Sequence, residues 1–487
     1  MHFSQYQFAK QFFITNKQEL PLLFSQWCKS PLKSDSVLYS HPALEVTKVE
    51  NKNTHIVCLG HIINPYIPTD TNKNILDKIL ENTAYFDTFE KSIYSMGGRW
   101  VLIVNSKDGK RIYHDAAGLK PVFFSSDKDK NINIASQPAL LEAIGVCHKQ
   151  EDVFNDFKRY RNSKSWPLGI IPYTNVKQLI PNHYLDLNTR ETSRYWPKSK
   201  LSITDVNVAA KKLSTILQGS IKALTLRNNC TMSLTGGYDS RMLFSCALND
   251  SDKINFFTTI SNFTPEYDRK TPEKLCKRYN LNHQFTQRNI DNNPEQNSLD
   301  ILSKNVGDMY YDRSMPNIFA FSAAIKENTH LPGSVSEIAR CYYYPYGLKL
   351  LKPTGKRIAK YAGFKGNPYA EEGFSHWLNN LPVNLPYEIL DLLYWEHRLG
   401  IWASCGLTFR EGVLEQIPPM NNREYMEISL AVNMKDRLPP HNLTKSIIKI
   451  NDKNLLNLLF NGSEDYWLYN RFPKIKYLRN VIATRLK

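Results

Sequence analysis

Residues 230–248, CTMSLTGGYDSRMLFSCAL, decide the fold of the second half of this chain. The run CTMSL is typical of a buried strand, and SRMLFSCAL has the apolar spacing of a helix. Between them, Gly236 and Gly237 allow the backbone to turn sharply and to approach a ligand closely. The amides of such a turn and of the next helical turn point outward, where the helix dipole favours an anion.

The polar side chains of this turn indicate which anion it binds. Thr235 and Ser240 add hydroxyl donors, but Asp239 adds a carboxylate that phosphate alone would repel. A Mg²⁺ ion that bridges the carboxylate and the phosphates removes this conflict. The pattern is neither a Walker A loop nor the dinucleotide pattern G-x-G-x-x-G. The alternative is a plain glycine turn capped by the Asp and Ser side chains.

The segments around this turn alternate between helices and strands. INFFTTI (254–260) has the composition of a strand, and the stretches 205–227 and 271–280 have the spacing of helices. This alternation predicts a parallel sheet, with ligands at the carboxyl ends of its strands. Residues 300–487 are expected to be mainly helical.

The first 200 residues have a different pattern, of short strands separated by turns such as SKDGK and SDKDKN. The predicted strands include HIVCLGHI (55–62), RWVLIVNS (99–106) and RIYHD (111–115). We therefore predict an α/β protein, with an α+β sandwich in residues 1–202 and a parallel-sheet domain in residues 203–487.

Composition excludes several classes of protein. The chain has 487 residues, of which 42% are hydrophobic and 22% charged, as in globular domains and unlike disordered chains. No apolar stretch approaches the ~20 residues of a membrane span, and the first residues do not resemble a signal peptide. The eight cysteines are scattered without a C-x-x-C pair, which argues against a zinc site. A cytoplasmic protein without a membrane partner is expected.

The net charge of +16 raises the question of an anionic partner. The last 53 residues alone carry 11 Lys or Arg against 4 Asp or Glu, but aromatic and apolar residues interleave with them. A packed segment with a solvated basic face is the simpler interpretation, so nucleic-acid binding is the weaker hypothesis.

The stretch Thr235–Ser240 resembles the S-G-G-x-D-S pyrophosphate loop of the PP-loop ATP pyrophosphatases, with Thr in place of the first Ser. Its surroundings resemble asparagine synthetase and its relatives, the β-lactam synthetases and lasso-peptide cyclases. The resemblance implies ATP and Mg²⁺ as cofactors. The residues it assigns to phosphate and metal are Thr235, Gly236, Gly237, Asp239 and Ser240, and the backbones of Leu234 and Ile260 would meet adenine.

Three later segments extend the resemblance, which covers nearly the whole chain. NLTKSIIKI (442–450) places Lys445 at the catalytic lysine of the family, with Lys449 as the competing choice. LLYWEHRLGIWASCGL (392–407) and IPPMNNREYMEISLAVN (417–433) resemble two family helices, the second with Asn422 where the family has Asp.

The segment LPGSVSEIARCYY (331–343) departs most from the family pattern, G-E-G-x-D-E. It places Ser334 at the first acid and Glu337 at the Asp that joins Asp239 in holding Mg²⁺. Since a serine is no proton acceptor for an incoming amine, Glu396 is a candidate replacement, with a salt-bridged helix residue as the alternative. The tyrosines 342–344 and 346 either line an acceptor pocket or form a buried cluster.

Residues 99–141 resemble the glutaminase domain of N-terminal-nucleophile amidotransferases, with Asp115, Gly118, Lys120 and Pro121 at matching places. Such enzymes use an amino-terminal cysteine as nucleophile. This sequence begins Met1-His2, so we expect a scaffold domain without glutamine hydrolysis.

Together these features predict an AMP-forming carbon–nitrogen ligase. It would activate the carboxylate of a small molecule, sugar acid or peptide as an acyl-adenylate for attack by ammonia or an amine. Glutamine-dependent asparagine synthesis is disfavoured by the missing cysteine and by Ser334. A non-catalytic nucleotide-binding homologue and a PP-loop enzyme that modifies nucleic acid are the alternatives.

Overall fold

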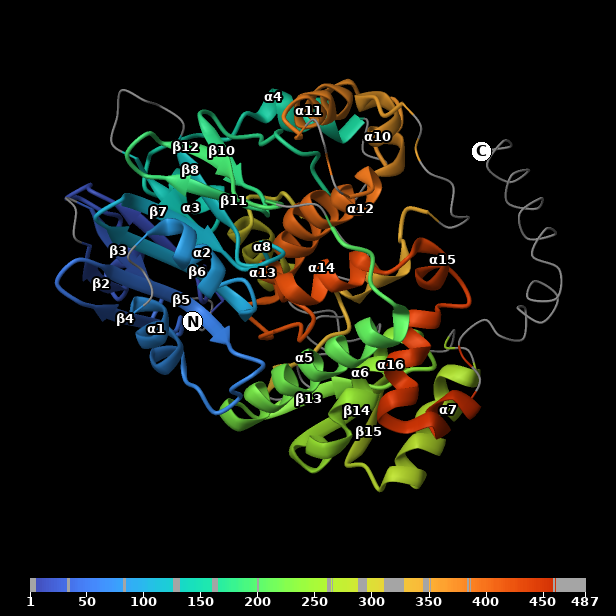
Figure 1. Ribbon diagram of the computed structural model, residues 1–487. Coiled ribbons are helices and arrows are strands. Elements are labelled where there is room, and N and C mark those ends of the chain that lie inside the picture. Colours follow the sequence, from blue (N-terminus) through green and yellow to red (C-terminus); the bar gives the residue numbers. More distant parts are fainter. Residues whose placement is uncertain are drawn as a thin grey trace.

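The computed structural model describes residues 6–32, 36–81, 85–125, 132–159, 165–198, 201–260, 264, 266–287, 296–310, 328–344, 350, 352–382, 385, 387–458 and 460. The architecture below is that of these residues. It has two parts, an antiparallel sandwich at one end and a small parallel sheet with helices at the other (Figure 1).

The first part is built from two six-stranded sheets, in which every pair of strands is antiparallel. One sheet has the order β10-β8-β9-β1-β3-β2, with bounds β1 Phe12–Thr15, β2 Cys28–Pro31, β3 Val37–Ser40, β8 Val122–Ser125, β9 Ile134–Ala135 and β10 Val176–Leu179. The other has the order β12-β11-β7-β6-β5-β4, with bounds β4 Val46–Glu50, β5 His55–Ile63, β6 Gly97–Ser106, β7 Gly109–His114, β11 His183–Asp186 and β12 Glu191–Arg194.

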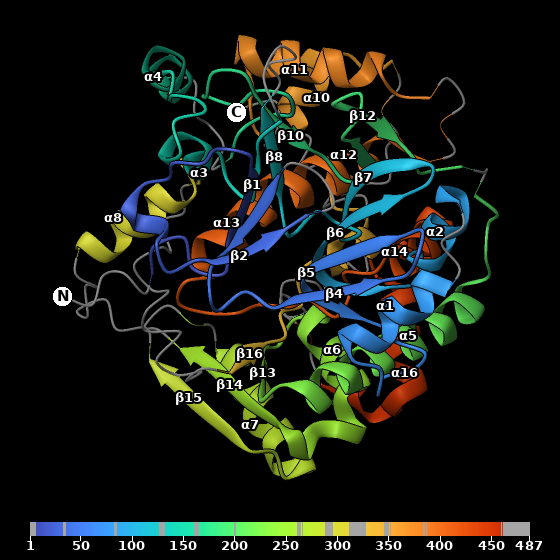
Figure 2. The ribbon, with the colours of Figure 1, turned by 90° about the vertical axis from the view of Figure 1, so that its left-hand side faces the viewer.

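Apolar residues cover both faces of these sheets. Alternate residues of each sheet form the core between them, for example Phe12 and Phe124 opposite Leu59 and Val101. The other faces pack against helices α1 (Asn72–Glu81), α2 (Phe86–Ser92) and α3 (Pro138–Ala143), and α4 (Glu151–Arg159) follows near one end (Figure 2). Strands buried on both faces read as continuous apolar runs, as in the sequence of β6.

The second part contains the predicted parallel sheet, with strand order β15-β14-β13-β16. Its strands are β13 Cys230–Ser233, β14 Ile254–Ile260, β15 His283–Gln287 and β16 Thr329–His330. Helices α5 (Val206–Arg227), α6 (Tyr238–Ala247) and α16 (Asn442–Asp452) pack against one another beside it, and α7 (Glu266–Tyr279) connects β14 to β15.

The remaining elements are mainly helical, as predicted. They are η2 (Leu22–Phe24), η3 (Leu248–Lys253), α8 (Gln296–Asn305), η4 (Ser336–Arg340), α10 (Gly355–Tyr361), α11 (Pro368–Asn379), α12 (Ile389–Leu393), the π-helical segment η5 (Tyr394–Ala403), α13 (Ser404–Arg410), α14 (Arg423–Ala431), α15 (Met434–Arg437) and η6 (Lys453–Asn457). In Figure 1 α13 and α14 lie in the middle of the molecule, between the sandwich and the parallel sheet.

The two-part α/β architecture expected from the sequence is therefore confirmed. The last antiparallel strand ends at Arg194 and α5 begins at Val206, on either side of the boundary predicted at residues 202 and 203. Arg227, at the end of α5, donates to the carbonyl oxygens of Ile62 and Asp70, so the two parts are joined directly. Within the described ranges, no helix combines the length and the apolar character that crossing a bilayer requires.

Candidate functional site

The turn between β13 and α6 is held together by its own hydroxyl groups. Thr235 Oγ1 and Ser240 Oγ lie 2.7 Å apart, and the Gly237 amide donates to Thr235 Oγ1 at 3.1 Å. Gly237 has a φ of −74°, which any residue can adopt. A glycine is therefore useful here because it lacks a side chain, not because it allows a left-handed conformation. It precedes α6 without a side-chain cap, which leaves amides of the first helical turn available to an anion.

Two side chains from outside the turn fix its backbone. Asp268, in the first turn of α7, accepts the Gly236 amide at 2.9 Å. Arg241 is fully buried and donates to the carbonyl oxygens of Gly236, Leu455 and Leu458. Burial lowers its pKa to about 10, so it remains a cation at neutral pH. Arg241 could not be singled out from the sequence, because its partners are backbone atoms, two of them more than two hundred residues later.

The two predicted metal ligands lie together. Arg340 Nη2 is 2.5 Å from Asp239 Oδ2 and 3.9 Å from Glu337 Oε1. The other oxygen of Asp239, Oδ1, is buried and has no hydrogen-bond partner among the described residues. Burial raises the pKa of Glu337, and the nearby charge of Asp239 raises it further. Tyr394, at the start of η5, donates to Glu337 Oε2 at 3.0 Å.

Lys445 lies in the first turn of α16, one turn after His441. Its amide donates to the carbonyl of His441, and the His441 ring contacts that of Tyr238, at a centroid distance of 5.0 Å. Burial lowers the pKa of His441, which also responds to the charges of Arg340, Asp239 and Lys445. Burial lowers the pKa of Lys445 as well, and its ammonium has no ion pair in the described part of the chain. Lys449 is exposed, one turn further along.

The segment before Arg340 closes against the turn. Gly333 lies so close that a Cβ atom added there would be 3.3 Å from Cβ of Asp239. Ser334 is exposed, and Val335 has a φ of 79°, a strained conformation for a β-branched residue. The Ser336 hydroxyl donates to the Gly333 carbonyl at 2.7 Å.

An aromatic wall stands beside Glu337. The rings of Tyr342 and Tyr343 pack on each other and on Tyr394, and the Arg398 guanidinium lies over the ring of Tyr342 at 5.2 Å. Tyr342 is 40% exposed, whereas Tyr344 is buried and its hydroxyl accepts the Leu390 amide. Tyr342 and Tyr343 therefore line the space beside Glu337, whereas Tyr344 belongs to the core. Tyr346 lies outside the described residues.

Glu396 does not belong to this site, which corrects the expectation that it replaces the missing acid. Its carboxylate is fully buried and accepts both Nη atoms of Arg194, at 2.5 and 2.9 Å. Asn182 and Trp377 each donate to it at 2.8 Å. The geometry favours the salt-bridged alternative, because no acceptor position is left for an amine proton.

The backbone of Leu234 is engaged within the sheet. Its amide donates to the Phe257 carbonyl at 2.9 Å, and its carbonyl accepts the Thr258 hydroxyl at 2.8 Å. Ile260 is the last residue of β14 and pairs with Gln287. A role of these two residues in adenine binding stays a prediction.

The residues of the glutaminase-like motif connect the two parts of the molecule. Asp115 is fully buried and accepts the amides of Leu119 and Lys120 and the side chain of Asn421. The Lys120 ammonium in turn lies 3.0 Å from Glu411. All eight cysteines are unpaired, and Cys28 is the exposed one, on β2.

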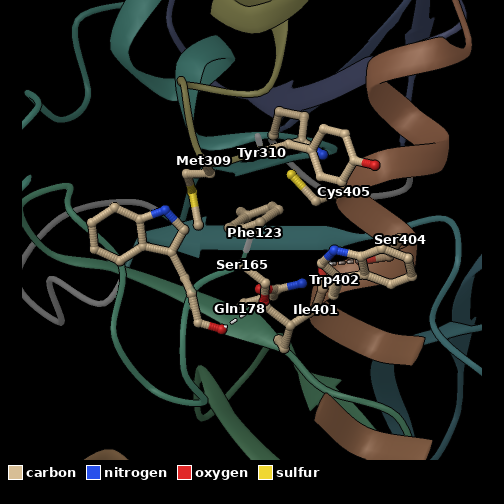
Figure 3. A pocket seen from close by; sticks show the side chains of 11 residues that line it. Phe123, Ser165, Gln178, Met309, Tyr310, Ile401, Trp402, Ser404 and Cys405 are labelled. Atoms are coloured by element: carbon tan, nitrogen blue, oxygen red, sulfur yellow. Dashed lines mark hydrogen bonds between the residues drawn. The ribbon is translucent and has the colours of Figure 1, made fainter. Parts of the chain in front are cut away.

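A small cavity lies away from the turn, between β8 and the helical segment that contains Trp402, Ser404 and Cys405 (Figure 3). Its volume is about 10 Å³, which matches one water molecule. Gln137, Trp166 and Trp402 are among its lining residues, and both amide atoms of Gln137 and the two indole nitrogens are buried without a hydrogen-bond partner among the described residues.

Comparisons with known proteins give solved structures only, since no family profile and no curated protein matches the chain. NMN synthetase from Francisella tularensis aligns with 40% of this chain and 94% of its own, at 14% identity and a TM-score of 0.20. Glutamine-dependent NAD+ synthetase from Acinetobacter baumannii aligns over 46% and 44%, at 16% identity and 0.22. Glutamine phosphoribosylpyrophosphate amidotransferase from B. subtilis aligns over 70% and 73%, at 10% identity and 0.24.

Proposed function

We propose that this chain is an ATP-dependent ligase that forms amide bonds by way of an acyl-adenylate. The observation that carries the proposal is the buried, unpartnered Oδ1 of Asp239, beside Glu337 and at the amino-terminal end of α6. A divalent cation among them would allow two carboxylates and a polyphosphate to share this place.

The residues present fit Mg²⁺. Within the described ranges, no three His, Cys, Asp or Glu side chains are grouped as metal ligands. Asp239 and Glu337 would therefore hold the ion together with phosphate oxygens and water, which is how Mg²⁺ is bound in nucleotide sites. When bound, the ion would neutralise charge on the departing pyrophosphate.

The residues of the turn would bind and orient the phosphate chain. The hydroxyls of Thr235 and Ser240 and the amides at the start of α6 are donors, and the fixed backbone costs no reorganisation. The substrate carboxylate then attacks the α-phosphorus, the bond between the α- and β-phosphates breaks, and pyrophosphate leaves. An amine or ammonia attacks the acyl carbon, loses a proton and displaces AMP.

Lys445 would stabilise the negative charge that accumulates in both steps, first at the α-phosphorus and then at the tetrahedral carbon. It is suited to this because its ammonium is half-buried and, among the described residues, not engaged by a carboxylate. A preorganised cation in a partly desolvated place stabilises a transition state more than an exposed one does.

Asn422 has a structural reason for its departure from the family pattern, which weakens the hypothesis of a non-catalytic homologue. Its side-chain oxygen caps α14 by accepting the Tyr425 amide at 2.9 Å. Its side-chain nitrogen donates to the Ser95 carbonyl at 2.6 Å, which an aspartate could not do.

The first test is pyrophosphate release with ATP, Mg²⁺ and a panel of amino acids, uronic acids and short peptides, each with ammonium, glutamine or no added amine. We expect release that depends on one class of carboxylate and that falls at least about a hundredfold in Asp239→Ala. The matched control is Asp252→Asn, an exposed aspartate in η3 that is expected to behave like the unaltered protein. If the unaltered protein failed to bind Mg·ATP, the ligase proposal would be wrong.

A further inference from the structure

Arg340 occupies the space that the two carboxylates would share with a divalent ion. Its Nη2 atom contacts Asp239 Oδ2 and approaches Glu337 Oε1, and its side chain is 22% exposed. A fixed cation therefore already balances part of the charge that Mg²⁺ would neutralise.

The pairing of Arg340 with Asp239 is incomplete. It uses a single Nη atom, while Arg340 Nε and Asp239 Oδ1 are both buried without a hydrogen-bond partner among the described residues. Arg437 and Asp391, which lie close by, form a complete pair through both Nη atoms and both carboxylate oxygens. Their two parallel contacts measure 2.7 and 2.9 Å, and both side chains are buried.

The same short segment takes part in both pairs, since Arg437 also donates to the carbonyl of Ile338 in η4. A bidentate Arg–carboxylate pair is the stronger geometry and serves stability. The one-armed pair beside the turn leaves Oδ1 of Asp239 without a hydrogen-bond partner among the described residues, so stability alone does not explain it.

The backbone holds Arg340 in place at a cost. Val335 and Cys341, on either side of η4, have φ values of 79° and 52°. A positive φ at a non-glycine residue costs of order 1 kcal/mol or more, and such strain collects at ligand sites.

We propose that Arg340 is a positioning residue that exchanges partners when nucleotide binds. Without nucleotide it pairs with Asp239, and a divalent ion competes with it for that carboxylate. With nucleotide bound, the ion takes Asp239 and Glu337, and the guanidinium pairs with phosphate oxygens, for which its planar fork is suited. This inference rests on the proposed function.

The proposal predicts opposite effects of one substitution on two ligands. In Arg340→Gln, Mn²⁺ should bind the nucleotide-free protein about tenfold more tightly, because the competing charge is gone. Pyrophosphate with Mg²⁺ should bind about tenfold more weakly, because a charge-assisted contact is lost. Bound Mn²⁺ is measured by electron paramagnetic resonance, and pyrophosphate by calorimetry.

Three further variants make the test decisive. Arg357→Gln, on the exposed face of α10, is the control for loss of one positive charge and should change neither affinity. Asp239→Ala should abolish the Mn²⁺ site, and equal Mn²⁺ binding in that variant would overturn the proposal. Arg340→Lys keeps the charge but loses the fork, so it should weaken pyrophosphate binding while leaving Mn²⁺ affinity nearly unchanged.

Unchanged or weaker Mn²⁺ binding in Arg340→Gln would show a merely structural residue and would overturn the proposal, even if the ligase activity stands. If Arg340→Gln did not fold, full pyrophosphate affinity in Arg340→Lys would overturn it. Failure of the unaltered protein to release pyrophosphate would instead count against the proposed function, because the Mn²⁺ comparison needs no turnover.

Discussion

The carboxylates of this molecule differ in how many partners they have. Those at the junction of the two parts have many, and those beside the turn at residues 235–240 have few. At the junction, Glu396 receives four hydrogen bonds, Glu411 contacts Arg99 and Lys120, and Glu415 contacts His61 and Lys10. Beside the turn, Asp239 has one contact with Arg340 and an oxygen without a partner in the described part of the chain.

The pKa values follow this difference. Burial acts to raise the pKa of Glu396, but the Arg194 guanidinium outweighs it, and the pKa is lowered. Burial likewise opposes ionisation of Glu415, but His61 and Lys10 hold its pKa far below the usual range. At Glu337 burial prevails and the pKa is raised. Carboxylates whose oxygens all have partners therefore stabilise the fold. Carboxylates with an oxygen left unpartnered are available to a ligand.

The largest expected effect is on stability, from Glu396→Ala. Removing this fully buried carboxylate takes away the ion-pair partner of the partly buried Arg194 and the acceptor of Asn182 and Trp377, which costs about 3–5 kcal/mol. The measurement is the free energy of unfolding from a urea titration followed by tryptophan fluorescence.

Glu337→Gln is the control for the loss of a carboxylate at a site where burial disfavours the charge, and it should unfold like the unaltered protein. If Glu396→Ala kept full stability but lost pyrophosphate release, Glu396 would have a catalytic role. The contrast between structural carboxylates at the junction and ligand-binding carboxylates beside the turn would then be wrong.

The next effect is on rate, from Lys445→Met. We expect pyrophosphate release to fall about 10²–10³-fold, the usual loss when one transition-state donor is removed. Stability should be unchanged, since the ammonium has no ion pair among the described residues. Lys449→Met, one turn along the same helix and exposed, is the matched control. Loss of activity in the Lys449 variant alone would assign the catalytic lysine to that position.

The sequence was sufficient for the features that depend on local pattern. The strand, glycine turn and helix at 230–248 have a periodicity that changes within a few residues, and the structure confirms all three. Asp239 and Glu337 were brought together by the resemblance, and the structure places both against Arg340.

Contacts between distant segments could not be predicted in this way. Arg241 and Arg340 look like ordinary helix residues, because their roles come from backbone and side-chain partners in other elements. Glu396 was placed near the chemistry, although its actual partner Arg194 lies about two hundred residues earlier, on the last strand of the sandwich. The basic residues 461–487 lie outside the described residues.

The smallest expected effect is the pH dependence of the free energy of unfolding that His61 causes at the junction. His61 lies between two carboxylates, with Nδ1 3.0 Å from Glu45 and Nε2 3.3 Å from Glu415. Burial alone would lower its pKa, but the two carboxylates raise it to about 9. A raised histidine pKa stabilises the fold fully below the unfolded value of about 6.5 and ceases to do so as the pH rises through 9.

We therefore expect the free energy of unfolding to fall by at most about 3 kcal/mol between pH 6.5 and 9.5, at about 1.4 kcal/mol for each pKa unit. The measurement is a set of urea titrations across this range. In His61→Gln the slope should be nearly absent, while His148→Gln, at an exposed position, should keep it. A slope that persisted in His61→Gln would mean that another group causes it and that Glu45 and Glu415 do not hold a charged His61 at the junction.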